Sequence, residues 1–171
     1  SELAEDVGAI DEAAAALKKG LEANPDHAEL LQRLSELFLV AKRWGDADQV
    51  TRKRLSLATT PEEKIAIGLQ LTQVNVELTR PREAASALTE AIKAGAPELE
   101  HLPRLMQLFE SGGQLRELTE AQARMIALYE GTGEKEKAAA LAVQRAKLLE
   151  TALGDKAEAI RRYADVLVGK P

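Results

Sequence analysis

Apolar side chains recur along this chain at spacings of three and four residues, the period of a helix with one buried face. The pattern predicts helical segments of about 13 to 20 residues throughout the sequence. Three of the predicted buried faces are made by Leu30, Leu31, Leu34, Leu37 and Phe38, by Ile67, Leu71, Val74 and Leu78, and by Leu102, Leu105, Leu108 and Phe109.

Clusters of glycine, proline and small polar residues interrupt this pattern at regular intervals. Pro61, Pro81 and Pro97 stand where helices should begin, because a residue in the first helical turn needs no N–H. The segments between the clusters predict nine helices, and the short connections predict antiparallel neighbours. The predicted turns are at Asn24-Pro25-Asp26, Trp44-Gly45-Asp46, Thr60-Pro61, Arg80-Pro81, Gly95-Ala96-Pro97, Ser111-Gly112-Gly113, Gly131-Thr132-Gly133 and Leu153-Gly154-Asp155.

The composition favours an all-α fold. Alanine and leucine dominate the 171 residues, and the aromatic residues are one Trp, two Tyr and two Phe. Strands favour β-branched and aromatic residues, whereas alanine and leucine favour helices. Nine short helices, in place of four long ones, indicate a repetitive architecture and not a four-helix bundle.

The two ends of the chain share a spaced pattern. Glu12-Ala13, Leu17, Gly20 and Pro25 correspond to Glu158-Ala159, Tyr163, Val166 and Pro171. This pattern resembles the second helix of a tetratricopeptide repeat, in which a small residue lets two helices approach closely. The resemblance identifies the chain as an irregular, bacterial-type array of this family and implies an α-α superhelix, a TPR-like solenoid. Equivalent places in its repeats are taken by Ala13, Ala47, Ala84, Leu118 and Ala159.

The resemblance implies a single helical-repeat domain over residues 1–171. It consists of a half repeat at 1–25 and repeats at about 26–61, 62–97, 98–133 and 134–171. The repeat at 62–97 departs from the family, whose usual Trp, Leu, Gly and Tyr are replaced by Gly68, Leu71, Thr72 and Asn75.

The ends of the chain predict a fragment of a longer protein, because it begins and ends on the second helix of a repeat and has no initiator methionine. The last helix offers Ile160, Tyr163 and Leu167 with nothing after it, whereas solenoid ends are normally capped by polar helices. Further repeats or end-to-end self-association are therefore expected to cover an end of the array.

Charge and composition narrow the classes of partner. The formal net charge is −5, whereas a nucleic-acid-binding protein usually carries a basic patch, so no nucleic-acid partner is expected. The absence of cysteine excludes disulfides, thiolate chemistry and cysteine-ligated zinc. No apolar run is long enough for membrane insertion and no secretory signal is visible, which makes the cytoplasm the default location.

No arrangement of residues predicts catalysis. His27 and His101 are far apart in sequence, and Glu98 and Glu100 lie too close to His101 to form a helical metal clamp. Both histidines are therefore interpreted as surface residues. Gly131-Thr132-Gly133 lacks the spacing of a phosphate-binding loop and predicts a turn. We expect no enzyme activity and no catalytic, cofactor-binding or metal-binding residue.

A basic cluster lies near the only tryptophan, Trp44, which is expected to pack between helices. Two interpretations of the cluster stay open: a solvated helix face, or a docking patch for an acidic partner. The cluster consists of Lys42, Arg43, Arg52, Lys53 and Arg54.

The last candidate is the concave groove that the resemblance implies, which the first helix of each repeat lines in this family. Arginine and glutamine at groove-facing positions can bind carboxylates and peptide amides. The Lys and Asn residues of the family's carboxylate clamp are absent, which disfavours chaperone-type partners. The candidate partner-binding residues are Arg33, Gln70, Gln73, Arg104 and Gln107.

The sequence therefore predicts a protein–protein interaction scaffold that binds a peptide or protein partner on a helical-repeat surface. Two alternatives stay open. The chain could be a structural spacer or self-assembly segment of a longer array, which would need no foreign partner, or a regulatory module of an attached enzyme.

Overall fold

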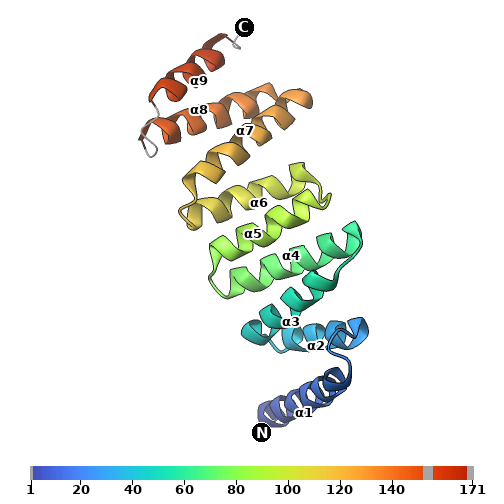
Figure 1. Ribbon diagram of the computed structural model, residues 1–171. Helices are drawn as coiled ribbons and strands as arrows, with labels where there is room; N and C mark the ends of the chain where they lie inside the picture. Colours follow the sequence, from blue (N-terminus) through green and yellow to red (C-terminus); the bar gives the residue numbers. More distant parts are fainter. Residues whose placement is uncertain (1, 152–155, 169–171) are drawn as a thin grey trace. The chain divides into compact units, whose positions relative to one another are not determined.

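The computed structural model describes residues 2–151 and 156–168, with side chains from residue 8 to 151 and from 160 to 168. Within these residues the chain forms nine α-helices and no strand, which confirms the predicted all-α fold (Figure 1). The predicted turn at Leu153-Gly154-Asp155 lies outside the described residues. The helices are α1 (Glu2–Ala23), α2 (Ala28–Val40), α3 (Trp44–Leu57), α4 (Pro61–Glu77), α5 (Pro81–Lys93), α6 (Glu98–Ser111), α7 (Leu115–Gly131), α8 (Lys135–Thr151) and α9 (Lys156–Val168).

The chain divides into two compact units, residues 1–96 with α1 to α5 and residues 97–171 with α6 to α9. Inside each unit every helix packs against the next helix in sequence, as expected for a stack of helical hairpins. The single domain over residues 1–171 and its repeat boundaries stay predictions.

The same hydrogen bond closes five connections between the described helices. In each, the N–H after a residue with positive φ donates to the carbonyl five residues earlier, as in the 2.8 Å bond from Arg43 to Phe38. Glycine supplies the positive φ at positions 95, 113 and 133. Lys42 and Thr79 adopt a φ of 54° although each carries a side chain.

The helix starts follow from proline and capping residues. Pro61 and Pro81 are the first residues of α4 and α5, as predicted. The hydroxyl of Thr60 accepts a bond of 3.2 Å from the N–H of Glu63, whose carboxylate accepts bonds from the N–H groups of Thr59 and Thr60. The bond from Thr59 is the main reason that the pKa of Glu63 lies below its usual value.

The predicted turn at Trp44-Gly45-Asp46 is wrong in position. Helix α3 begins at Trp44, and the connection before it runs from Ala41 to Arg43. The connection contains Lys42 in a positive-φ conformation, which its sequence does not signal because lysine rarely adopts it. Trp44 is partly buried and packs against a core cluster that contains Phe38 and Ala47, which confirms its predicted packing between helices.

Three of the five residues that define the predicted repeat register are buried. Ala47 and Ala84 are fully buried and Leu118 is buried, as predicted. Ala13 is exposed, however, and the buried alanine of α1 is Ala14. Several alanines adjoin in this helix, so the pattern alone did not reveal which one faces α2. The side chain of Ala159, the last predicted landmark, is outside the described set.

Gly68 explains one departure from the family pattern. A Cβ atom at this position would lie 3.1 Å from the Cβ of Ala91 and 3.3 Å from the carbonyl oxygen of Ala87. Helix α5 therefore approaches α4 too closely for the tryptophan that the family prefers there. The hydroxyl of Thr72 donates to the Gly68 carbonyl at 2.8 Å, so this buried polar side chain is satisfied within its own helix.

Candidate partner-binding surfaces

Three of the predicted partner-binding residues lie on α2 and α4 in the first unit. Arg33 is exposed and forms an ion pair with Glu29, one turn earlier, at 2.7 Å. Gln73 is exposed, and its amide donates to the carboxylate of Glu77 at 2.8 Å. Contacts within one helix therefore orient both side chains. Gln70 is partly buried, and its hydrogen-bond partner is a residue of α3.

Gln70 accepts a hydrogen bond of 2.8 Å from Arg54, a residue of α3. The same guanidinium nitrogen, Nη1, also donates to the buried hydroxyl of Ser35 on α2 at 3.3 Å. Arg54 thus bridges three helices and adds a cation beside the predicted residues. Burial lowers the pKa of Arg54, and the charge of Glu36 opposes that shift.

Arg104 and Gln107 are exposed on α6 in the second unit. The five predicted residues therefore form two sets, one on α2 and α4 of the first unit and one on α6 of the second. Their assignment to a partner-binding surface stays a prediction.

The basic cluster around Trp44 is largely committed to contacts inside the protein. Arg43 pairs with Asp46 at 2.7 Å, and this hydrogen bond is the main reason that the pKa of Arg43 is raised. Arg52 pairs with Asp48 at 2.9 Å. Lys53 also pairs with an aspartate, Asp26 of the preceding connection, at 2.5 Å. These ion pairs favour the solvated-face interpretation for most of the cluster.

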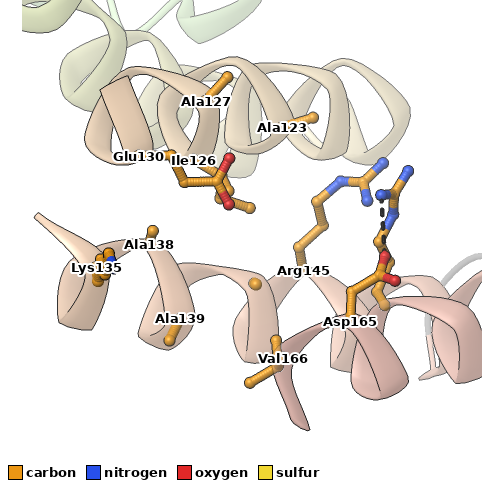
Figure 2. Close-up of a pocket in the computed structure, with 12 residues that line it drawn as sticks. Ala123, Ile126, Ala127, Glu130, Lys135, Ala138, Ala139, Arg145, Asp165 and Val166 are labelled. Atoms are coloured by element: carbon orange, nitrogen blue, oxygen red, sulfur yellow. Dashed lines mark ion pairs between the residues drawn. The ribbon is translucent and has the colours of Figure 1, made fainter. Parts of the chain in front are cut away.

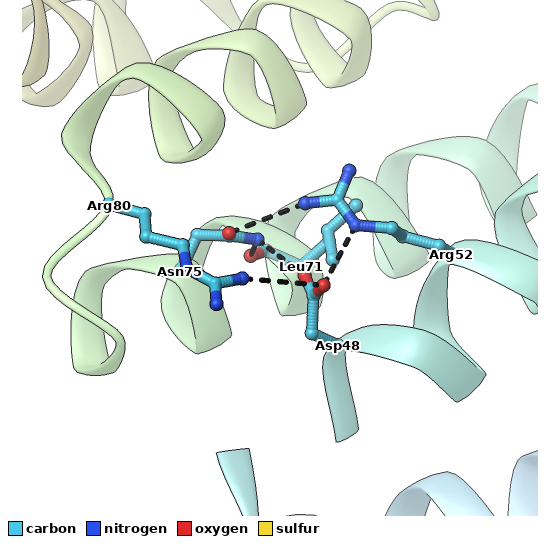
Figure 3. A network of polar contacts seen from close by, with 5 residues as sticks. All are labelled: Asp48, Arg52, Leu71, Asn75 and Arg80. Atoms are coloured by element: carbon cyan, nitrogen blue, oxygen red, sulfur yellow. Dashed lines mark hydrogen bonds and ion pairs between the residues drawn. The ribbon is translucent and has the colours of Figure 1, made fainter. Parts of the chain in front are cut away.

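A buried polar network links α3 and α4 (Figure 3). The carboxylate of Asp48 accepts bonds from the side-chain amide of Asn75 at 3.0 Å and from Nε of Arg52 at 2.9 Å. Arg80 adds a more distant ion pair at 3.8 Å. Asp48 and Asn75 are buried and their contacts are internal, so we assign the network to stability and not to partner binding.

A cavity of about 480 Å³ lies in the second unit between α7, α8 and α9 (Figure 2). Alanines of α7 and α8 line much of it, together with charged side chains from all three helices. Among these, Nε of Arg145 donates to the carbonyl of Thr119 at 2.8 Å, and Arg162 pairs with Asp165 at 3.5 Å. These contacts hold the charged groups within the unit.

The remaining candidates for chemistry are a helix cap, a helix residue and a turn. His27 caps α2, since its ring accepts the N–H of Leu30 at 3.4 Å, and His101 is partly buried on α6. Gly133 has a φ of 80° in the connection after α7, which confirms the predicted turn. In the described part of the chain no three His, Asp or Glu side chains are grouped to hold a metal ion. Of the helices described, none has the length and apolar character needed to cross a membrane.

Comparison with known proteins relates the chain to helical-repeat proteins. A family model described as tetratricopeptide repeat matches residues 5–60. Among proteins of curated function, none matches the sequence. Solved structures of similar fold include MamA, with 23% identity and a TM-score of 0.51 over 95% of this chain and 90% of that one.

Two further solved structures have a similar fold. YrrB, described as a TPR protein with an unusual peptide-binding site, is 17% identical with a TM-score of 0.53, over 97% of this chain and 80% of that one. A putative kinesin light chain of Podosopora anserina with TPR-like repeats is 16% identical with a TM-score of 0.52, over 98% and 91%. These likenesses confirm the predicted helical-repeat fold.

Proposed function

Because residues 5–60 match the tetratricopeptide repeat and the chain has the fold of proteins built from it, we propose that this protein is an interaction scaffold that binds a peptide segment of another protein. Proteins with this fold generally mediate protein–protein interaction and are typically not catalytic. The mechanism is binding on a pre-formed helical surface, and no covalent bond is made or broken.

The carrying observation is that Arg33 on α2 and Gln73 on α4 are exposed, each in contact with a carboxylate of its own helix, Glu29 and Glu77. Contacts of this kind between exposed side chains one helical turn apart are weak in water, so a partner can replace them. Guanidinium and amide groups are suited to the carbonyls, amides and carboxylates of an extended peptide. YrrB, a relative in fold, is described as having a peptide-binding site, which supports a peptide as the partner class.

Charge reversal on the two sets of predicted residues tests this proposal. We expect the double variant Arg33→Glu, Arg104→Glu to lose a partner that the unchanged protein captures from a cell extract, as identified by mass spectrometry. A matched control is Lys93→Glu, Lys147→Glu, which makes the same change in charge at exposed positions on α5 and α8. Unchanged helical circular dichroism would show that both variants fold. Retention of the partner at full affinity by the first variant would rule out a role for Arg33 and Arg104.

Self-assembly within a longer array is the second candidate function, and the last helix favours it. Ile160 is 67% exposed and Leu167 is 72% exposed, on a helix whose other side packs against α8. Large apolar side chains in water are costly, by about 1.5–3 kcal/mol each relative to burial. Light scattering over a range of concentrations distinguishes the two functions, because self-assembly raises the mass of the pure protein whereas peptide binding does not. We place either function in the cytoplasm, which fractionation of cells would check.

A further inference from the structure

Arg54 differs from its basic neighbours in the groups that hold its guanidinium. Arg52 and Lys53 each reach a carboxylate, at 2.9 Å on Asp48 and at 2.5 Å on Asp26. Within the described residues no carboxylate lies at ion-pairing distance from Arg54, whose hydrogen bonds all end on uncharged oxygens. It is therefore a cation whose nearest contacts do not neutralise it.

The position of this cation matches the surface proposed to bind a peptide. Nη1 of Arg54 donates to the hydroxyl of Ser35 on α2 and to the amide oxygen of Gln70 on α4. Ser35 is fully buried, and its hydroxyl lies 3.1 Å from that of Thr51, so the bond fixes one edge of the guanidinium against the core. In the described residues neither Nε nor Nη2 forms a hydrogen bond, so the other edge of the guanidinium is unbonded.

The surroundings of Arg54 make a missing counter-ion costly. The side chain is partly buried, and the loss of water around it lowers its pKa. The attraction between this guanidinium and a bound carboxylate is stronger in such partly buried surroundings than in bulk water. The carboxylate of Glu36 is close enough to attract it but instead accepts a bond of 2.9 Å from Gln32.

We propose that Arg54 anchors an acidic side chain, Asp or Glu, of a peptide that crosses α2 and α4. The proposal rests on the proposed function and names the chemistry of the partner. Capture of a chain terminus generally uses several converging donors, such as a nest of backbone N–H groups. Arg54 offers one free edge, which fits a single carboxylate side chain within a longer segment. The glutamine amides on either helix suit the backbone of that segment.

Peptide display on the 171-residue chain tests this inference. One library presents random segments followed by a fixed carrier, so that no peptide carboxyl terminus is free, and a second library ends in a free terminus. We expect the first library to be enriched in peptides with Asp or Glu at one position. In a synthetic peptide of that sequence, replacing the acidic residue by its amide should weaken binding roughly ten- to hundred-fold.

Protein variants connect this preference to Arg54. Arg54→Met keeps the apolar stem and should bind the acidic peptide and its amide form equally weakly. Lys93→Met, which removes the same charge from an exposed position on α5, should retain the full preference. The comparison of the two peptides on unaltered protein remains decisive even if Arg54→Met folds poorly.

The outcomes separate the two proposals. Enrichment without an acidic position, enrichment only of free carboxyl termini, or an acidic preference that a folded Arg54→Met retains would overturn the role of Arg54 and leave peptide binding intact. If neither library yields a binder above an unrelated helical protein, peptide binding itself is overturned.

Discussion

Asn75 donates its side-chain amide to the carboxylate of Asp48 at 3.0 Å, across the packed surfaces of α4 and α3. Asn75 has no exposed surface, and Asp48 is 7% exposed. The amide of Asn75 also donates to the carbonyl of Leu71 at 2.9 Å, within its own helix (Figure 3). The pair thus joins two helices that the sequence assigns to successive repeats, through groups that are almost entirely shielded from water.

Removing the amide from this pair should destabilise the protein. We expect Asn75→Leu to lower the free energy of unfolding by about 2–3 kcal/mol, because the carboxylate of Asp48 loses a buried donor. Urea unfolding followed by circular dichroism measures the loss. The double variant Asp48→Leu, Asn75→Leu should recover part of it, since both partners are then apolar. A single variant within about 0.5 kcal/mol of the unaltered protein would show that the network contributes little.

The positive φ of Thr79 predicts a stabilising substitution. A β-branched residue rarely adopts a φ of 54°, whereas glycine does so without steric cost. We expect Thr79→Gly to raise the free energy of unfolding by up to about 1 kcal/mol, a net value because glycine also makes the unfolded chain more flexible. Thermal unfolding provides the measurement. The control is the reverse change at an equivalent turn, Gly133→Thr, which should destabilise the protein. Loss of stability in Thr79→Gly would contradict the strain assigned to Thr79.

The close approach of α4 and α5 predicts that Gly68 cannot be enlarged without cost. Gly68→Val should lower the free energy of unfolding by about 1–3 kcal/mol, because its Cβ would already lie 3.1 Å from Ala91 before the methyl groups are added. Gly45→Val is the matched control in a helix, since a Cβ there meets no atom within 4 Å. That control should be neutral or slightly stabilising. Chemical denaturation of both variants checks the contrast.

The capping interaction of Glu63 predicts a specific dependence on pH. Backbone hydrogen bonds from Thr59 and Thr60 lower the pKa of this carboxyl from its ordinary value of 4.5. A lowered folded-state pKa adds stability above the unfolded-state value, and that contribution is lost as the pH falls through the folded-state value. We therefore expect the unaltered protein to lose stability relative to Glu63→Gln as the pH is lowered below about 4.5. Parallel stability curves for the two proteins at low pH would contradict the interaction.

The helices were predictable because each depends on residues close together in sequence. Apolar spacing located their buried faces, and Pro61 and Pro81 marked the first residues of two of them. The start of α3 was missed because Lys42 performs the role expected of glycine, and a lysine in sequence carries no signal of a positive φ. Helix boundaries can thus be predicted from sequence where the turn contains the residue type that usually forms it.

The candidate site was less predictable because it depends on contacts between helices. The sequence placed Arg54 in a basic cluster but did not distinguish it from Arg52, which lies two residues away. The distinction arises because Arg52 faces Asp48, whereas Arg54 reaches Ser35 and Gln70. Such a difference depends on the side of α3 to which each guanidinium turns and on what the neighbouring helices present there.

The turns that close through a bond to the carbonyl five residues earlier have a consequence for how such an array can change over generations. Each of these bonds begins and ends within six consecutive residues, as from Arg43 to Phe38 and from Arg80 to Asn75. A gene could therefore gain or lose the coding segment for one whole hairpin while every other turn keeps its own closure. The number of hairpins in such an array can therefore change without a change in the turns that remain.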